Sequence, residues 1–247
     1  AGWVSFPPGG QRAAGFALIG KGQERAAAAS AMVISQFEPA VVVNLGIAGS
    51  ISDDVSLGDV VVADQVVSYM ANSKVKPTGS DGFRFEPAGE ALRSDEFLVD
   101  RLRQIPLVSP SKFDDWTRRA QLSVRREAGR DDPNVATVHL HVGPVASGPA
   151  VVGATAFKNW MKGTKRDYLA VEMESSGVAI AAELSGMLRR VRFLALRGIS
   201  DAADEQKNQL EKESKGSVRG GAMENALDLL MILLDGLSPE IYRRLKR

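Results

Sequence analysis

The stretch that decides the fold is PAVVVNLGIAGS, residues 39–50. Its centre is a run of β-branched apolar residues that closes on glycines, which is typical of a buried parallel strand. The preceding segment, residues 23–37, reads QERAAAASAMVISQF and is rich in helix formers. Before it, GFALIGKG at residues 15–22 has the pattern of a short strand that ends in glycines. The opening therefore predicts a right-handed βαβ unit.

The same alternation continues along the chain. Further strands are predicted at GDVVVADQVVSYM (58–70), ATVHLHVGPVASG (136–148), YLAVEME (168–174) and RRVRFLALRGISD (189–201). Further helices are predicted at SDEFLVDRLRQI (94–105), GATAFKNWMKGT (153–164), SSGVAIAAELSGM (175–187) and NALDLLMILLDGL (225–237). Between Ala71 and Asn134, where Pro and charged residues dominate, we expect surface loops around the helix at 94–105.

These elements predict an α/β fold, namely a three-layer αβα sandwich around a mostly parallel or mixed central sheet. We expect residues 1–247 to form a single domain. The first residues, AGWVSFPPGG, contain neither an initiator Met nor a signal-peptide pattern. Two explanations stay open: the chain is a piece of a larger protein, or its own N-terminal strand is missing.

Composition excludes several classes of function. Lys plus Arg total 31 and Asp plus Glu total 30, a balance that argues against a general nucleic-acid-binding surface. The absence of cysteine excludes disulfides, thiol catalysis and thiolate metal sites, and it fits a cytoplasmic location. No apolar run approaches the roughly 18 residues of a membrane helix. His139 and His141 share a strand face, but no carboxylate stands at a fitting spacing, so we expect no metal.

Polar residues gather where the predicted strands end. Ligands of open α/β sheets bind beyond the carboxyl ends of the strands. Four such ends carry glycines, serines, carboxylates or an arginine, at residues 46–50, 147–152, 172–174 and 197–204. Together they indicate a small-molecule pocket.

Three segments resemble signature motifs of the nucleoside phosphorylase superfamily. They are VVVNLGIAGSISDDVSLGDVVVADQVV (41–67), VEMESSGVA (171–179) and LRGISDAAD (196–204). They are most similar to the 5′-methylthioadenosine/S-adenosylhomocysteine nucleosidases. The similarity runs from about Gly15 to Leu234 and is weak between about Ser68 and Pro133.

The resemblance implies cleavage of a purine–ribose bond through an oxocarbenium-like sugar. Asp201 would donate a proton to N7 of the leaving base, and Ser200 would orient it. Glu174 would bind the ribose hydroxyls, Met173 would pack under the ribose, and Glu172 would support them.

The remaining implied site residues come from the other strand ends. Arg197 would lie near the nucleophile and the ribose, while the backbone of Ala48 and Gly49 would line the sugar. The backbone at Val152 would read the base edge, and Val151 replaces the aromatic residue that stacks on adenine in the family.

The choice of nucleophile rests on Asn44 and Leu45. Phosphorylases of this superfamily commonly place an Arg there to hold phosphate, so water is favoured here. Nothing in residues 1–15 matches the glutamate that activates water in the nucleosidases. The tail after Asp201 has an Asp–Lys–Asn pattern that resembles phosphorylase-like domains of larger signalling or defence proteins. A solvated charged loop is the simpler interpretation of that tail.

We therefore expect a cofactor-independent purine nucleosidase that hydrolyses an adenine nucleoside such as methylthioadenosine or S-adenosylhomocysteine. The resemblance also implies a homodimer. Three alternatives stay open: a nucleoside phosphorylase, a nucleotide-cleaving domain of a larger signalling or defence protein, and a non-catalytic nucleoside-binding module.

Overall fold

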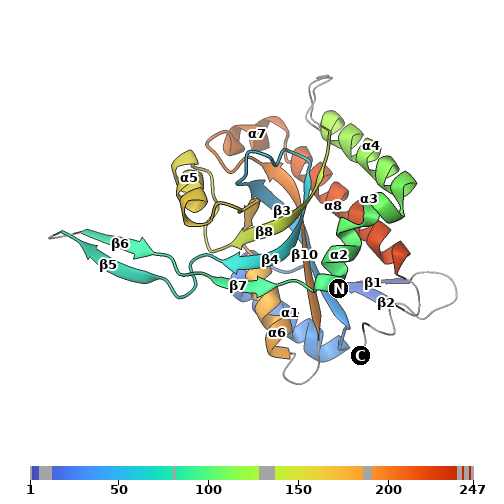
Figure 1. Cartoon of the computed structure of the whole chain (residues 1–247), viewed down its shortest axis with the longest axis horizontal. Coiled ribbons are helices and arrows are strands. Elements are labelled where there is room, and N and C mark those ends of the chain that lie inside the picture. Colours follow the sequence, from blue (N-terminus) through green and yellow to red (C-terminus); the bar gives the residue numbers. More distant parts are fainter. Residues whose placement is uncertain are drawn as a thin grey trace.

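A computed structural model of the chain describes residues 2–5, 13–79, 82–127, 137–185, 191–237, 241 and 245. At its centre lies a six-stranded mixed sheet (Figure 1). The strands are β3 (Val41–Ser50), β4 (Val60–Ser68), β7 (Glu90–Arg93), β8 (Leu140–Ser147), β9 (Ala170–Glu172) and β10 (Arg192–Asp201). Their order is β10-β3-β9-β8-β4-β7, and β10 also pairs with β4, so the sheet closes on itself.

The strand register brings distant motifs together. Strand β10 runs parallel to β3, and after a register shift Asp201 pairs with Gly49. Gly49 in turn pairs with Val171 of the antiparallel strand β9, and Val171 pairs with Ala146 of β8. Four strands therefore contribute neighbouring residues to one row, which contains Asp201 and Gly49 from two of the expected strand ends and lies directly before the other two, at Ser147 and Glu172.

Helices cover both faces of the sheet, which confirms the predicted αβα sandwich. On one face, α1 (Gln23–Phe37) and α6 (Ser175–Ser185) pack on β3, β4 and β10. On the other face, α2 (Glu96–Arg103), α4 (Pro110–Glu127) and α8 (Ser217–Gly236) bury a second apolar cluster around Trp116 and Leu229. The remaining helices are α3 (Ile105–Val108), α5 (Thr155–Thr164) and α7 (Lys207–Glu213).

The prediction that residues 15–22 form the first strand of a βαβ unit is wrong. Of residues 15–22, only Gly15 and Phe16 lie in a strand, β2 (Ala13–Phe16). That strand pairs antiparallel with β1 (Gly2–Ser5) and not with the central sheet. Leu18 is 96% exposed, so the short apolar run does not enter the core.

The expectation of loops between Ala71 and Asn134 is also wrong for the part that the structure describes. This region forms the hairpin of β5 (Lys74–Thr78) and β6 (Gly82–Glu86), then β7, α2, α3 and α4. The hairpin extends away from the body of the molecule (Figure 1). Its strands have no buried face, so the hydrophobic alternation that reveals a strand is weak here. Residues 128–134 of this region lie outside the described part.

None of the helices that the structure describes has the length and apolarity that a bilayer crossing demands.

Candidate active site

An ion pair between Arg197 and Glu172 is buried in the protein. Arg197 Nη2 lies 2.5 Å from Glu172 Oε2, and the two side chains are 2% and 1% exposed. The same nitrogen donates hydrogen bonds to Ser175 Oγ at 2.7 Å and to Asn44 Oδ1. Room for the guanidinium comes from Gly46, where a Cβ would lie 1.9 Å from Arg197 Nη1. Buried charges are costly unless they are paired and hydrogen-bonded, and this network supplies both conditions.

Glu172 also fixes the start of α6. Its Oε2 accepts hydrogen bonds from the backbone N–H groups of Glu174 and Ser175, both at 2.9 Å. The first N–H groups of a helix have no hydrogen-bond partner within the helix. The Glu172 carboxylate supplies that partner for the Ser175 N–H, at the start of α6. Met173 and Glu174 lie half-buried in the turn that it holds. The two glutamates of the segment YLAVEME (168–174) thus have different surroundings, because Glu172 contacts the Arg197 guanidinium and Glu174 accepts a backbone hydrogen bond.

Glu174 contacts the beginning of α1. Its Oε1 accepts a hydrogen bond from the Gly22 N–H at 3.1 Å. Beside this contact, Gln23 Nε2 donates to Ser176 Oγ, and the Ser147 hydroxyl donates to Ser176 Oγ at 3.0 Å. Gln23 and Ser176 were not predicted from the sequence, because a single Gln and scattered serines form no recognisable motif. The polar cluster joins β8, α1 and α6 next to Glu174.

Asp201 is buried at the end of β10, with 7% of its surface exposed. Ser200 Oγ donates to Asp201 Oδ2 at 2.9 Å, and the Ala203 N–H donates to Oδ1 at 3.0 Å. A Cβ at Gly49 would lie 2.7 Å from Asp201 Oδ1, so the position of the carboxylate requires glycine there. Asp201 therefore occupies a defined orientation against β3.

Lysine side chains surround the Asp201 end of β10. Lys207 Nζ lies 3.3 Å from Asp201 Oδ2, and Lys158 Nζ donates to the Ala202 carbonyl at 3.0 Å. Burial and the neighbouring Lys162 lower the pKa of Lys158, while nearby carboxylates oppose that shift. Lys207 was not predicted as a site residue, although it belongs to the Asp–Lys–Asn pattern. These two ammonium groups can attract an anion to this end of the sheet.

An apolar cluster lies next to Asp201. Val152, Ala203, Ile51 and Val171 are buried together. Ala48 of β3 is buried as well, whereas the side chain of Val151 is exposed. Of the two valines expected at the base, the structure therefore places Val152 in the interior and Val151 at the surface.

The strand register places most of the expected site residues near one another. Asp201 and Val171 lie two strands apart in one row, a separation of roughly 10 Å at the usual spacing of strands. Ala48 and Gly49 lie between them on β3, and the turn with Met173 and Glu174 follows Val171 directly. Arg197 lies four residues before Asp201 in the buried network with Glu172. Arg197 thus contacts the end of β9 through Glu172.

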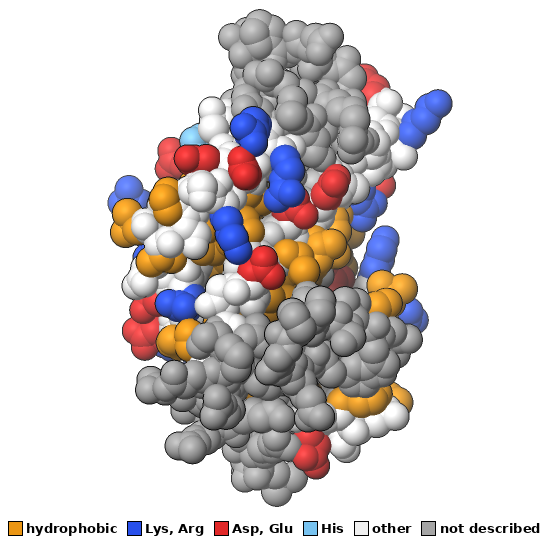
Figure 2. All heavy atoms as spheres, turned by 90° about the vertical axis from the view of Figure 1, so that its right-hand side faces the viewer, with side chains coloured by type: hydrophobic (Ala, Val, Ile, Leu, Met, Phe, Trp, Pro, Cys, Tyr) orange, Lys and Arg blue, Asp and Glu red, His pale blue; other side chains and the backbone are white. Residues whose placement is uncertain are grey.

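The surface formed by α4 and α8 carries charges of both signs. Lys112 pairs with Asp235, and Arg119 pairs with Asp228. Figure 2 shows this side of the molecule, where the coloured basic and acidic side chains alternate around hydrophobic patches. Nucleic-acid binding depends on a concentrated positive field, which the described side chains on this face do not form.

A model of the phosphorylase superfamily matches residues 12–235 of the chain. Among curated proteins, a 5′-methylthioadenosine/S-adenosylhomocysteine nucleosidase from Maridesulfovibrio salexigens is 27% identical over 208 residues, covering 82% of this chain and 76% of that protein. A death domain-containing ATP nucleosidase from Amphimedon queenslandica is 27% identical over 187 residues, covering 71% of this chain and 31% of that protein.

Solved structures show the same fold. The 5′-methylthioadenosine/S-adenosylhomocysteine nucleosidase from Neisseria meningitidis, in complex with methylthio-immucillin-A, superimposes with a TM-score of 0.62 at 21% sequence identity. The superposition covers 89% of this chain and 80% of that one. It agrees with the αβα architecture.

Proposed function

Because the chain belongs to the phosphorylase superfamily, we propose that it is a purine nucleosidase, which hydrolyses the N-glycosidic bond of an adenine nucleoside. One observation carries the proposal: the buried carboxylate of Asp201 is held by Ser200 against Gly49, two strands from the turn that bears Glu174. The sequence similarity to a methylthioadenosine/S-adenosylhomocysteine nucleosidase supports the choice of substrate.

In the proposed reaction, Asp201 donates a proton to N7 of the purine while the bond between N9 and C1′ breaks. The electron pair of that bond leaves with the base. Water attacks C1′ and loses one proton to solvent, which gives adenine and a free sugar, and Asp201 takes up a proton from solvent for the next turnover. Glu174 binds the ribose hydroxyls, and its negative charge stabilises the oxocarbenium-like sugar. Ser200 keeps Asp201 oriented through the 2.9 Å hydrogen bond.

Arg197 is best assigned as a positioning residue. Its guanidinium contacts Glu172, Ser175 and Asn44 in the interior and fixes the turn before α6. Asn44 stands where phosphorylases carry a phosphate-binding Arg, and here its side chain is engaged with Arg197 and Ser175. A buried amide in that position supports water over phosphate as the nucleophile.

A second candidate function is cleavage of an adenine nucleotide. Lys207 Nζ lies 3.3 Å from Asp201 Oδ2, so an ammonium group stands at the candidate site. A phosphate group on the substrate would form a charge-assisted contact with this ammonium. The similarity to a protein named as an ATP nucleosidase supports this alternative.

An adenine-release assay tests these proposals. The purified chain is mixed with methylthioadenosine, S-adenosylhomocysteine, adenosine or ATP, with and without inorganic phosphate, and free adenine is measured by chromatography. The nucleosidase proposal predicts adenine and free sugar at a rate independent of phosphate. Release that requires phosphate contradicts hydrolysis, and calorimetric binding without any release indicates a non-catalytic module.

We also propose, from the resemblance, that residues 1–247 fold as one domain and associate as a homodimer. Sedimentation velocity of the chain tests the assembly, because a monomer at micromolar concentration would contradict it.

A further inference from the structure

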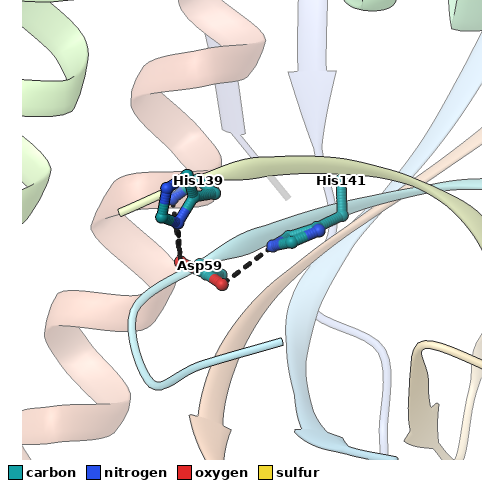
Figure 3. Close-up of side chains that lie close together, drawn as sticks. All are labelled: Asp59, His139 and His141. Carbon is teal, nitrogen blue, oxygen red and sulfur yellow. Dashed lines mark hydrogen bonds and ion pairs between the residues drawn. The ribbon is translucent and has the colours of Figure 1, made fainter. Parts of the chain in front are cut away.

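The two histidines of the chain meet at one buried carboxylate. His141 Nε2 lies 2.8 Å from Asp59 Oδ2, and His139 Nδ1 lies 3.8 Å from Asp59 Oδ1. Figure 3 shows both imidazole rings beside the Asp59 carboxylate. Atoms of the three side chains that could bind a metal ion all lie within 4.8 Å of one another.

The sequence shows no carboxylate at a fitting spacing from His139 and His141, and no metal is expected from it. The fold nevertheless brings Asp59 beside both rings from the segment before β4. The register explains the contact, because the first residue of β4, Val60, pairs with Leu140 between the two histidines. The residues are about 80 positions apart in sequence, so no local spacing could reveal the cluster.

One of the two imidazole–carboxylate separations suits a single ion, whereas the other, 2.8 Å between His141 Nε2 and Asp59 Oδ2, is a hydrogen bond that an ion would replace. In zinc sites, ligand atoms lie about 2.0–2.2 Å from the metal, so two ligands of one ion lie roughly 3–4 Å apart. The separation of 3.8 Å between His139 Nδ1 and Asp59 Oδ1 is too long for a hydrogen bond, but it suits two ligands. Two imidazoles with one carboxylate are a donor set that favours Zn²⁺ and related transition ions over Mg²⁺ or Ca²⁺.

The carboxylate is held in place independently of the histidine rings. Asp59 is 1% exposed, and it accepts backbone hydrogen bonds from Ser56 and His139, both at 2.8 Å. Hydrogen bonds of this kind orient carboxylate ligands in metal sites. A site whose buried ligand is already fixed loses little conformational freedom when an ion binds.

The other side of the cluster is open. His139 is 58% exposed at its side chain, and it lines a groove of about 420 Å³ together with Asp114, Thr117 and Arg118 of α4. Three protein ligands with access to solvent leave a coordination position for water or a small anion.

We propose that Asp59, His139 and His141 form a binding site for a divalent transition-metal ion, with Zn²⁺ as the ion that suits the ligands best. The site is distinct from the candidate active site but linked to its framework. Ile199 N donates to the Asp59 carbonyl at 2.8 Å, and Gly58 N donates to the Ile199 carbonyl at 2.9 Å. Ile199 lies two residues before Asp201. A bound ion would therefore stabilise the segment with Gly58 and Asp59, to which this part of β10 is hydrogen-bonded.

Cobalt titration of the untagged chain tests the proposal, because Co²⁺ reports ligand geometry through its visible absorption and Zn²⁺ displaces it. The chain has two histidines and no cysteine, so a tag-free preparation offers no competing imidazole or thiolate. We expect one Co²⁺ per chain with a spectrum of nitrogen–oxygen coordination. His139→Gln and His141→Gln should each weaken binding by about tenfold or more.

The glutamine variants remove the imidazole but keep a polar side chain that can hydrogen-bond to Asp59. Asp100→Asn serves as the matched control, because Asp100 is an exposed carboxylate paired with Arg103, and its affinity for Co²⁺ should equal that of the wild type. The proposal is overturned if the wild type binds no stoichiometric ion, or if either histidine variant binds as tightly as the wild type.

Discussion

Replacing Arg197 by Met should destabilise the protein by about 3–5 kcal/mol, the usual effect of removing one partner from a buried ion pair. Met fills much of the volume of the arginine stem but lacks the guanidinium that contacts Glu172, Ser175 and Asn44. Glu172, whose side chain is 1% exposed, would then carry an unpaired charge in the interior. Only its hydrogen bonds from the N–H groups of Glu174 and Ser175 would remain.

Thermal unfolding followed by circular dichroism measures the effect. In a protein of this size, each 1 kcal/mol shifts Tm by roughly 2–4 °C, so we expect Tm to fall by about 6–20 °C. Arg103→Met is the control, because Arg103 pairs with Asp100 where the two side chains are 54% and 43% exposed. An exposed pair contributes at most about 1 kcal/mol, so the control should shift Tm by less than about 4 °C.

A second substitution tests the cause. Adding Glu172→Gln to Arg197→Met removes the unpaired charge and keeps an oxygen that can accept from Ser175 N–H, so the double variant should recover about 1 kcal/mol or more. The reasoning is refuted if Arg197→Met shifts Tm no further than Arg103→Met does, or if Glu172→Gln makes the Arg197→Met protein less stable.

Three further predictions concern single side chains. Gly49→Ala places a Cβ 2.7 Å from Asp201 Oδ1, so the carboxylate must move and kcat for adenine release should fall by about 10²-fold. If the substrate is a nucleotide, Lys207→Gln should lower kcat/KM for ATP by about tenfold or more, because the contact with phosphate is lost. The kcat/KM for adenosine, which has no phosphate, should stay nearly unchanged. Burial raises the pKa of Tyr168 to about 12, whereas an unfolded tyrosine titrates near 10. Between these values only the unfolded state has lost its proton, so stability falls as pH rises, by up to about 1.4 kcal/mol per pH unit. Tyr168→Phe should remove this part of the slope in urea unfolding between pH 10 and 12.

Each of these three predictions has an outcome that would contradict it. Wild-type kcat in Gly49→Ala would show that the position of Asp201 does not limit the reaction. An equal loss with adenosine and ATP in Lys207→Gln would assign the lysine to Asp201 and not to a phosphate. An unchanged alkaline slope in Tyr168→Phe would place the titration in other groups.

Local elements of the fold were predictable from the sequence because hydrophobic periodicity reports burial along one segment. The helix predicted over residues 23–37 is α1, and the apolar run at Val41–Ser50 is β3. The alternation of Val138, Leu140 and Val142 also predicted one buried face, and all three residues pack in the same cluster.

Pairing between distant segments was not predictable in the same way. Periodicity says that a strand is buried but not which strand lies beside it, so the antiparallel contact of β10 with β4 was missed. The ion pair of Arg197 with Glu172 depends on a glycine at position 46, and no local pattern shows that requirement. The contact of Lys207 with Asp201 crosses a charged loop that was interpreted as solvated.

The most direct test of the account is adenine release by Asp201→Asn. Asparagine keeps the shape and the hydrogen bonds of the buried side chain but cannot donate the proton to the base. We predict an unchanged fold, retained nucleoside binding by calorimetry, and a rate lower by about 10²–10⁴-fold. Adenine release at the wild-type rate by a correctly folded Asp201→Asn protein would contradict the role of this carboxylate as the proton donor.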